Sequence, residues 1–478
     1  MSRFLISAAH KSSGKTTITI GLCAALKARG LAVQPFKKGP DYIDPMWLSL
    51  ASGKPCRNLD FYLMARDEIC ALYQQYAATA DVSIIEGNKG LYDGLDLDGS
   101  NSNSALARLL AIPVVLVIDA RGMTRGIAPL ILGYQAFDPE INIAGVILNH
   151  LGGARHESKL RAVIEHYTEV PVLGAVPHDS ALQIEERHLG LMPSNESEES
   201  GRRVQILGQI MAAQLDITRL LALDAPVAAA RALPPISHPV SGAPEAIRIG
   251  IARDKAFGFY YEDDLEALRT AGAKLVPIDT LHDQGLPGID GLFIGGGFPE
   301  MAMQELEANA LLRENLRLAI ESGMPVYAEC GGLMYLARSI SWKGRRCEMV
   351  GVIPGDIVMH DRPVGRGYVR LQQNTHSPWC QPGDADNLEI RAHEFHYSTL
   401  ENLDPETRFA YHVVRGHGVD GMHDGIIYKN LLASYTHLRS LQSYNWAARF
   451  VSWVKEKSHD ARIARRSPPT SQAAITIN

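Results

Sequence analysis

The sequence predicts two doubly wound α/β domains joined by a short linker. The chain has 478 residues, more than one hydrophobic core usually serves. In its first half, continuous apolar runs of strand length alternate with helical stretches, a pattern typical of a parallel sheet buried on both faces. Residues 233–246 are rich in Pro, Ala and Ser, and an apolar strand follows at once. We therefore expect an N-terminal domain over 1–232, a linker over 233–246 and a C-terminal domain over 247–445.

Composition and charge narrow the class of protein. Hydrophobic residues make up 46% of the chain and charged residues 21%, as in ordinary globular proteins. The net charge of −6 gives no reason to expect nucleic acid or an anionic membrane as a partner. No apolar run reaches membrane-spanning length and no signal peptide is recognisable. We therefore expect the reducing cytoplasm as its location. The six cysteines form no CxxC pair, which indicates neither a zinc site nor a disulfide framework.

Each expected strand is a short apolar run beside a turn or a helical stretch. In the first half these runs cover residues 4–8, 82–86, 114–119, 143–149 and 172–177, and a helix from 16 to 29 follows the first. In the second half they cover residues 247–252, 292–294 and 325–328. The tail, residues 458–478, is rich in Arg, Ser and Pro, and we expect it to be disordered.

The most informative stretch is residues 325–336, PVYAECGGLMYL. It predicts a buried strand, a glycine turn and a helix, with Cys330 at the elbow. A helix N-terminus favours thiolate over thiol, and the next backbone N–H can face a developing oxyanion. We interpret Cys330 as a nucleophile that attacks a carbonyl carbon; the alternative is a buried cysteine that acts as a small hydrophobe.

A thiolate nucleophile needs a base, usually a histidine. His437 follows a predicted strand and is the first candidate. His393 and His396 are its competitors, and their stretch lacks the HExxH spacing of a zinc site. Alternation puts Glu394 and His396 on one strand face and His393 on the other. The run GGGFPE at residues 295–300 is either an oxyanion hole built from backbone N–H groups or a flexible turn.

A phosphate-binding loop is predicted between the first strand and the first helix, in HKSSGKTT at residues 10–17. Backbone N–H groups at the helix N-terminus would hold phosphate oxygens, and a lysine would neutralise them. Ala9 replaces the first glycine of the strict P-loop pattern, so the loop is a variant; the alternative is a generic turn. The residues expected to bind ATP here are Gly14, Lys15, Thr16 and Thr17.

Acidic residues follow in two places. Asp41 and Asp44 lie in a turn segment, and Glu86 ends an apolar strand. A carboxylate at the carboxyl end of a sheet strand lies beside the phosphate loop, and Mg²⁺ binds through one or two carboxylates plus phosphates. We assign Thr16, Asp41 and Glu86 as metal ligands, and Asp41 and Asp44 to the nucleotide site. The alternative is that the two aspartates are turn formers.

Lysines flank these acids. Lys37 and Lys38 precede the turn segment, where they either bind an anionic substrate or the nucleotide, or are solvated surface groups. After the strand that ends at Glu86, the loop continues with Asn88 and Lys89 and then GLYDG at residues 90–94.

Together these stretches resemble the cobyrinic acid a,c-diamide synthase family. Its members fuse a dethiobiotin-synthetase-like, P-loop ATP-binding domain to a class I, triad-type glutamine amidotransferase domain with a flavodoxin-like fold. The resemblance runs in the family's order from residue 4 to about residue 440. The matching stretches are residues 13–17, 34–44, 86–87, 90–94, 295–300, 328–336, 393–398 and 433–437.

The resemblance implies two coupled reactions. In the C-terminal domain Cys330 attacks the side-chain amide of L-glutamine and releases ammonia, with His437 activating the thiol. In the N-terminal domain ATP and Mg²⁺ convert a carboxylate of a tetrapyrrole into an acyl phosphate, which ammonia then attacks. For this family the carboxylates are the a and c acetates of cobyrinic acid, so a carbon–nitrogen ligase of cobalamin biosynthesis is expected. The oligomeric state stays open, with a homodimer among the options.

The chain departs from the family in two places. Arg439 stands where many class I amidotransferases have a glutamate, two residues after the histidine, so no third triad residue is expected from that position. The cobyrinate branch commonly lacks it too. The glycine-poor loop at residues 8–13 and the Asn88–Lys89 pair also differ from the usual loops. These differences leave sirohaem, nickel-sirohydrochlorin and hydrogenobyrinic acid as alternative acceptors.

Two hypotheses from other classes compete with an enzyme. A regulatory or partitioning P-loop ATPase often carries a lysine five residues before the loop lysine, whereas Lys11 is four residues before Lys15. Such an ATPase also has no use for the Cys330 elbow. An inactive binding module on the amidotransferase scaffold would not need both Cys330 and His437. The sequence therefore favours the enzyme.

Overall fold

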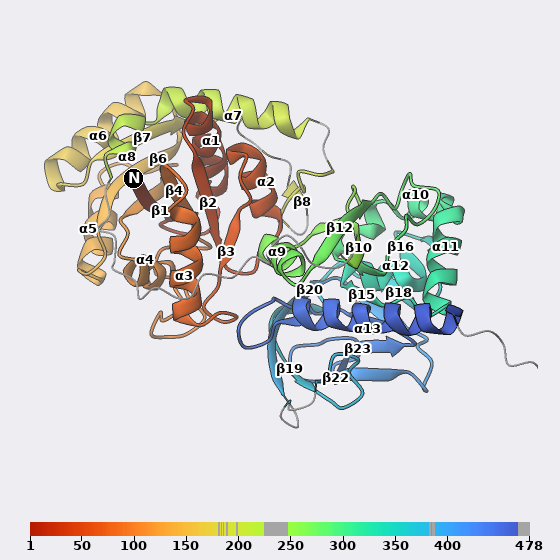
Figure 1. Cartoon of the computed structure of the whole chain (residues 1–478). Coiled ribbons are helices and arrows are strands. Elements are labelled where there is room, and N and C mark those ends of the chain that lie inside the picture. The colour runs from red at the N-terminus through yellow and green to blue at the C-terminus, as the bar shows by residue number, and fades with distance from the viewer. Residues whose placement is uncertain are drawn as a thin grey trace, which may run out of the picture. The chain divides into compact units, whose positions relative to one another are not determined.

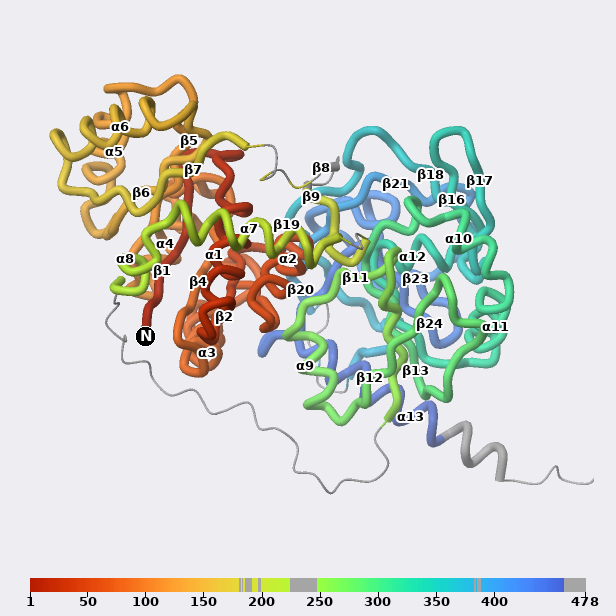
Figure 2. The backbone as a smooth tube through the Cα atoms, turned by 90° about the horizontal axis from the view of Figure 1, so that it is seen from above, coloured from red at the N-terminus to blue at the C-terminus, as the bar shows by residue number. Residues whose placement is uncertain are grey.

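The computed structural model describes residues 1–179, 182, 184, 186–187, 190–196, 199–223, 247–381, 384 and 388–466. The chain divides into two compact units, Met1–Ile236 and Ser237–Asn478, and each is described by itself. Figure 1 shows the elements of both units, and Figure 2 follows the same backbone from above. The predicted linker, residues 233–246, lies outside the described residues.

A parallel sheet of seven strands forms the centre of the first unit, in the order β3-β2-β4-β1-β5-β6-β7. Its strands are β1 (Ser2–Ala8), β2 (Val33–Lys38), β3 (Arg57–Leu59), β4 (Val82–Glu86), β5 (Val114–Asp119), β6 (Ile143–Leu151) and β7 (Val172–Pro177). A separate pair is formed by β8 (Glu186–Arg187) and β9 (Gly190–Leu191). The strand order reverses around β1, and open α/β sheets bind ligands outside the carboxyl ends of the strands at such a point.

Helices cover both faces of this sheet, as a doubly wound fold requires (Figure 1). Helices α1, α2 and α7 contact one another on the face that holds Phe4 and Ile84, with Leu22 and Met211 in the same core. Helix α4 lies on the other face, where Asn103 bonds to Ser7. The helices are α1 (Lys15–Ala28), α2 (Ile43–Ser52), α3 (Arg66–Ala77), α4 (Asn103–Leu110), α5 (Ile127–Phe137), α6 (Ala154–Tyr167), α7 (Ser200–Gln214) and α8 (Ile217–Leu221).

The second unit is built on a mixed sheet of nine strands, in the order β12-β10-β13-β15-β24-β23-β22-β19-β20. The first five are parallel in the flavodoxin-like order, and the last four continue the sheet antiparallel. Its strands are β10 (Ile247–Ala252), β12 (Ala273–Ile278), β13 (Gly291–Ile294), β15 (Val326–Glu329), β19 (Gly365–Gln373), β20 (Glu389–His396), β22 (Arg408–Arg415), β23 (His423–Tyr428) and β24 (Leu431–Ser434). The predicted α/β class is confirmed for both units.

Two smaller sheets complete the strands of this unit. One holds β17 (Arg345–Glu348), β16 (Ala337–Trp342), β18 (Ile353–Met359) and β21 (Ser398–Glu401), and the other pairs β11 (Phe257–Phe259) with β14 (Gly296–Gly297). The helices are α9 (Glu262–Thr270), a 3₁₀ turn (Pro299–Met301), α10 (Met303–Ala308), α11 (Ala310–Glu321), α12 (Gly331–Leu336) and α13 (Trp446–Arg466). Helices α10 and α11 lie side by side in both views (Figure 1, Figure 2).

Each face of the nine-stranded sheet has its own core. One core holds Leu316 of α11 and Leu333 of α12, and the other holds Leu268 of α9 with Trp446 and Phe450 of α13. Burial of these aromatic side chains anchors α13, and the sequence carries no proline or glycine before Pro468 to stop it. Residues 458–466 are therefore helical, which corrects the expected disorder there, and residues 467–478 lie outside the described part.

Candidate active sites

The predicted phosphate loop lies between β1 and α1. Gly14 precedes the helix with φ +83°, and a Cβ there would come 2.1 Å from Nδ2 of Asn149, so only glycine fits. Asn149 Nδ2 also donates to the Ser13 carbonyl at 2.9 Å, which fixes the loop against the end of β6. Because α1 begins at Lys15, the first N–H groups of the helix, including those of Thr16 and Thr17, have no partner within the helix. These groups are the ones that hold phosphate oxygens in P-loops.

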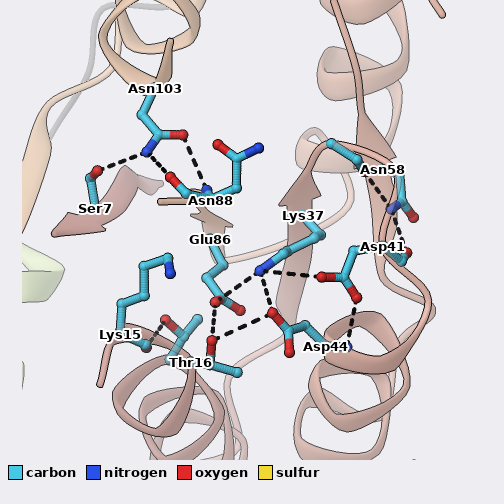
Figure 3. Close-up of polar contacts among 12 residues, drawn as sticks. Ser7, Lys15, Thr16, Lys37, Asp41, Asp44, Asn58, Glu86, Asn88 and Asn103 are labelled. Carbon is cyan, nitrogen blue, oxygen red and sulfur yellow. Dashed lines mark hydrogen bonds and ion pairs between the residues drawn. The ribbon is translucent and has the colours of Figure 1, made fainter. Parts of the chain in front are cut away.

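A lysine among carboxylates lies at the carboxyl edge beside this loop (Figure 3). The register of β2 on β4 pairs Lys37 with Glu86, which places both side chains on one face of the sheet. Lys37 Nζ is 3.0 Å from Glu86 Oε1 and also forms an ion pair with Asp44. The Thr16 hydroxyl donates to Glu86 Oε1 at 2.5 Å and lies 3.4 Å from Asp44 Oδ2. The predicted residues Thr16, Asp44 and Glu86 are thus brought together.

Asp41 lies at the margin of this cluster. Its Oδ2 is 3.9 Å from Lys37 Nζ, and its Oδ1 accepts the backbone N–H of Asp44 at 3.0 Å. The side chain therefore supports the start of α2, as its alternative role as a turn former suggested. Of the two aspartates, the structure places Asp44 beside Thr16 and Glu86, whereas the sequence predicts Asp41 as the metal ligand.

The buried charges shift each other's pKa. Burial lowers the pKa of Lys37, but Asp44 and Glu86 outweigh it and hold that pKa well above its usual value. Burial also lowers the pKa of Lys15, and the charge of Lys37 lowers it further. For Asp44, the attraction of Lys37 outweighs burial and lowers the pKa, whereas burial raises the pKa of Glu86. The cluster thus contains a firmly protonated Lys37 and an ionised Asp44.

The donor set near Thr16 fits Mg²⁺ held together with a nucleotide. Thr16, Asp44 and Glu86 offer hard oxygen ligands, and Glu86 Oε2 is buried without a hydrogen-bond partner among the described residues. Within the described ranges, no three His, Cys, Asp or Glu side chains are arranged to hold a metal alone. Mg²⁺ commonly takes one or two carboxylates and completes its shell with phosphates and water.

A second lysine lies buried at the same edge of the sheet. Lys38 is 6% exposed, and its Nζ donates to the Asn88 side-chain oxygen at 3.1 Å. The Asn103 amide donates to the Asn88 carbonyl at 2.5 Å (Figure 3). It also donates to the Gly90 carbonyl at 2.9 Å, so it fixes the loop around Asn88. Burial lowers the pKa of Lys38 to about 8, although Asp60 opposes the shift. Lys38 is therefore a buried cation that an incoming anion would stabilise.

In the second unit, Cys330 occupies the predicted elbow between β15 and α12. Its backbone has φ +47° and ψ −102°, a strained conformation for a residue with a side chain, and such strain clusters at active sites. The Cys330 N–H donates to the Ser434 carbonyl at 2.7 Å, which ties the elbow to the end of β24. The side chain is 6% exposed.

His437 lies three residues beyond β24, just past the strand end as predicted, and its side chain is hydrogen-bonded to Cys330. Its backbone exchanges two hydrogen bonds with His393 of β20, at 2.8 and 3.3 Å. Burial lowers the pKa of His437, but hydrogen bonds to Cys330 and Glu329 outweigh it and raise the pKa to about 10. The ring is therefore an imidazolium at neutral pH, which suits a thiolate partner.

Glu329 is a residue of this site that sequence reasoning missed. Its Oε2 is 3.3 Å from Nδ1 of His437, and both side chains are 4% exposed. The signal was its place directly before Cys330, at the carboxyl end of a buried strand. Arg439 stands at the position where many class I amidotransferases carry the third triad residue, a glutamate. Its guanidinium contacts Asp263 at 2.8 Å.

The glycine-rich run at residues 295–300 lies against the elbow. A Cβ on Gly331 would come 3.0 Å from the Gly297 nitrogen, and one on Gly296 would come 2.6 Å from Cε1 of His437. A Cβ on Gly297 would come 1.9 Å from the Ala256 carbonyl oxygen. Glycine is thus required for the backbone to approach the nucleophile this closely, which favours the oxyanion-hole interpretation over a flexible turn.

His393 and His396 point to different faces of β20, as alternation predicted. The ring of His393 stacks on that of His437 with centroids 4.9 Å apart, and burial holds its pKa well below the usual value. His396 lies 3.8 Å from Glu394 and stacks on Tyr435 with centroids 4.0 Å apart. His437, not these competitors, is hydrogen-bonded to Cys330.

Comparison with known families defines the class of protein. The model of the CobQ/CobB/MinD/ParA nucleotide-binding domain matches residues 5–191, and that of the CobB/CobQ-like glutamine amidotransferase domain matches residues 248–444. These ranges contain the phosphate loop and the Cys330 elbow, respectively. The chain is therefore a glutamine amidotransferase fused to a nucleotide-binding domain, in the class of amidating ligases.

Curated relatives identify the family within that class. A cobyrinate a,c-diamide synthase of Magnetococcus marinus is 48% identical over 95% of this chain and 97% of that protein. Proteins of the same name from Methanosarcina acetivorans and Listeria monocytogenes are 44% and 41% identical, over 92% and 93% of this chain and 92% and 97% of their own lengths. The chain belongs to the cobyrinate a,c-diamide synthase family. Among the described residues, no helix is long and apolar enough to cross a membrane.

Proposed function

We propose that this protein uses ATP and L-glutamine to amidate the a and c acetate carboxylates of cobyrinic acid, a step of cobalamin biosynthesis. The observation that carries the proposal is the presence of two complete polar sites in one chain. One contains Cys330 and His437, and the other contains the phosphate loop with Lys37 and Glu86. Relatives that are 48% and 44% identical, over 97% and 92% of their own lengths, bear the name of that activity.

Ammonia is made at the Cys330 site. The proton of the Cys330 thiol already resides on His437, and the Cys330 thiolate attacks the carboxamide carbon of glutamine. His437 then protonates the departing nitrogen, which leaves as ammonia, and water hydrolyses the thioester to glutamate. The backbone near Gly297 and Gly331 faces the oxyanion that forms in both steps.

The acceptor is activated at the phosphate loop. A carboxylate is a poor acyl donor, and transfer of the γ-phosphoryl group of ATP converts one of its oxygens into a leaving group. Lys15 and the first N–H groups of α1 hold the nucleotide phosphates. Thr16, Glu86 and Asp44 or Asp41 would hold Mg²⁺, which when bound neutralises charge on the phosphates.

Lys38 and Lys89 receive a carboxylate of the acceptor in this proposal. Lys38 is a buried cation whose hydrogen-bond partner, Asn88, is neutral. Lys89 is exposed on the same loop with φ +43°, and its charge further lowers the pKa of Lys38. After the first amidation the acceptor carries one new amide beside the carboxylate that reacts next. The Asn88 side-chain amide can hydrogen-bond to either group, because it both donates and accepts.

We also place the enzyme in the reducing cytoplasm, since all six cysteines are free thiols.

Mass spectrometry of the product tests the proposal. Purified protein is incubated with cobyrinic acid, ATP, Mg²⁺ and glutamine, and with the same mixture lacking ATP. A product with two carboxyl groups converted to amides, formed only with ATP, is expected. Parallel reactions replace cobyrinic acid by sirohaem, nickel-sirohydrochlorin or hydrogenobyrinic acid. A diamide of one of these, with cobyrinic acid left unchanged, would show that the acceptor is a different tetrapyrrole. No amidated product in any reaction would overturn the proposal.

A further inference from the structure

The carboxylate of Glu329 is held against the histidine of the glutamine site by a set of fixed contacts. Its Oε2 lies 3.3 Å from Nδ1 of His437. Its Oε1 accepts the Tyr327 hydroxyl at 2.6 Å and the Leu438 backbone N–H at 2.9 Å. Glu329 is 3% exposed, so these contacts are shielded from water. The carboxylate is therefore aimed by its own strand and by the residue that follows the histidine.

The parallel pairing of β15 with β24 explains this geometry. Glu329 is the register partner of Ser434, so its side chain comes from the strand next to the one that leads to His437. The strand end that presents the nucleophile thus also presents the carboxylate, one residue earlier. A glutamate two residues after the histidine is not needed in this arrangement. Arg439 stands at that position, and its guanidinium donates a hydrogen bond to Asp263.

The other charged and titratable groups around His437 do not replace this contact. Cys330 shares a hydrogen bond with the ring, and His393 stacks on it with a lowered pKa that keeps it neutral. Arg439 is a nearby cation that lowers the pKa of His393 and would oppose a charged His437. Among the groups named here, Glu329 is the carboxylate that faces Nδ1 of His437.

We propose that Glu329 is the positioning carboxylate of the glutamine site, in place of the missing glutamate after the histidine. Its Oε2 accepts a hydrogen bond from the Nδ1–H of His437, which fixes the tautomer and the ring plane. The carboxylate also stabilises the imidazolium formed when the Cys330 thiol gives up its proton. The Nδ1 proton stays on the ring throughout. This inference rests on the proposed function of Cys330 as the nucleophile toward glutamine.

Glu329→Gln tests the role, because it keeps the shape and removes the charge. Release of glutamate from glutamine is measured from pH 5 to pH 11, and ammonia-driven amidation serves as the check of fold. We expect kcat for glutamine to fall on the order of 10²- to 10⁴-fold with little change in KM. The alkaline limb of the profile should move to lower pH, because the imidazolium loses its stabilising partner.

Two further variants keep the test decisive. Tyr327→Phe removes the 2.6 Å hydrogen bond that orients Oε1, and a smaller fall with the same shift of the alkaline limb is expected. Asp356→Asn removes a carboxylate from the four-stranded sheet of the same unit and should leave the profile unchanged. A Glu329→Gln profile identical to wild type, or an equal loss of ammonia-driven amidation, would overturn the role. Absence of glutaminase in the wild type would instead overturn the proposed function.

Discussion

Lys37 and Glu86 form a buried ion pair of 3.0 Å between neighbouring strands of the first sheet. The pair lies beside the Thr16 hydroxyl, where the nucleotide phosphates are proposed to bind. Three acidic side chains surround this ammonium, so Lys37 supplies the positive charge that keeps the carboxylates together before Mg²⁺-ATP arrives. The proposed nucleotide site is therefore assembled from a charge network of the protein itself.

Replacing Lys37 by methionine should destabilise the N-terminal unit. The change leaves Asp44 and Glu86 buried without their cation, and breaking a buried pair in this way costs about 3–5 kcal/mol. Urea unfolding at pH 7 measures the loss, and Lys54→Met, at a half-buried lysine whose Nζ donates to the Thr79 backbone carbonyl, is the matched control. Equal stability of Lys37→Met and wild type would contradict the role of Lys37.

Lys15→Ala should separate the two reactions. Loss of the phosphate-binding ammonium removes ATP-dependent amidation, while glutamate is still released from glutamine at the Cys330 site. Product formation and glutamate release are measured on the same samples, with Lys11→Ala, an exposed lysine of the same loop, as the control. A normal yield of diamide from Lys15→Ala would show that the loop does not bind the nucleotide as proposed.

Lys38→Met should weaken binding of the acceptor and leave the nucleotide site intact. We expect KM for cobyrinic acid to rise at least about tenfold, the equivalent of about 1.4 kcal/mol, with KM for ATP and glutamine unchanged. Lys89→Gln should act in the same direction with a smaller effect, since that side chain is exposed. An unchanged KM for the acceptor in both variants would refute the assignment, as would an equal rise in KM for ATP.

The stability of the C-terminal unit should depend on pH through His437. Its pKa is raised from the usual 6.5 to about 10 in the folded state, so protonated His437 stabilises the fold fully below about pH 6.5. That contribution is lost as the pH rises from about 6.5 to 10. The difference in unfolding free energy between wild type and His437→Gln, measured at pH 6 and at pH 9.5, should therefore shrink with rising pH. A difference that grows would contradict the charge assigned to His437.

Much of the fold was predictable because its strands are apolar runs of the right length. The strands β1, β4, β5 and β10 are buried on both faces and contain few polar residues, which is the pattern that sequence reasoning detects. Strand β2 escaped prediction since it carries Pro35, Gln34 and two lysines. These polar groups are tolerated in the sheet because Gln34 and Lys37 find partners in the fold.

The candidate sites were predictable to the extent that their residues lie close together in sequence. Cys330 and the phosphate loop were identified from strand–turn–helix patterns, and His437 from its place after a strand. Glu329 was missed because its contact with His437 spans 108 residues and depends on the pairing of β15 with β24. Asp44 was separated from Asp41 only by the direction in which each side chain points from the start of α2.

Transfer of isotope from labelled glutamine tests the coupling of the two sites most directly. Wild type and Cys330→Ala are each given ATP, Mg²⁺, cobyrinic acid and either amide-¹⁵N glutamine or ¹⁵N ammonium, and the product is weighed by mass spectrometry. We predict two ¹⁵N amides in the wild type from either source, and in Cys330→Ala from ammonium alone. Labelled amides formed by Cys330→Ala from glutamine, or failure of the folded variant with ammonium, would contradict two separate sites linked by ammonia.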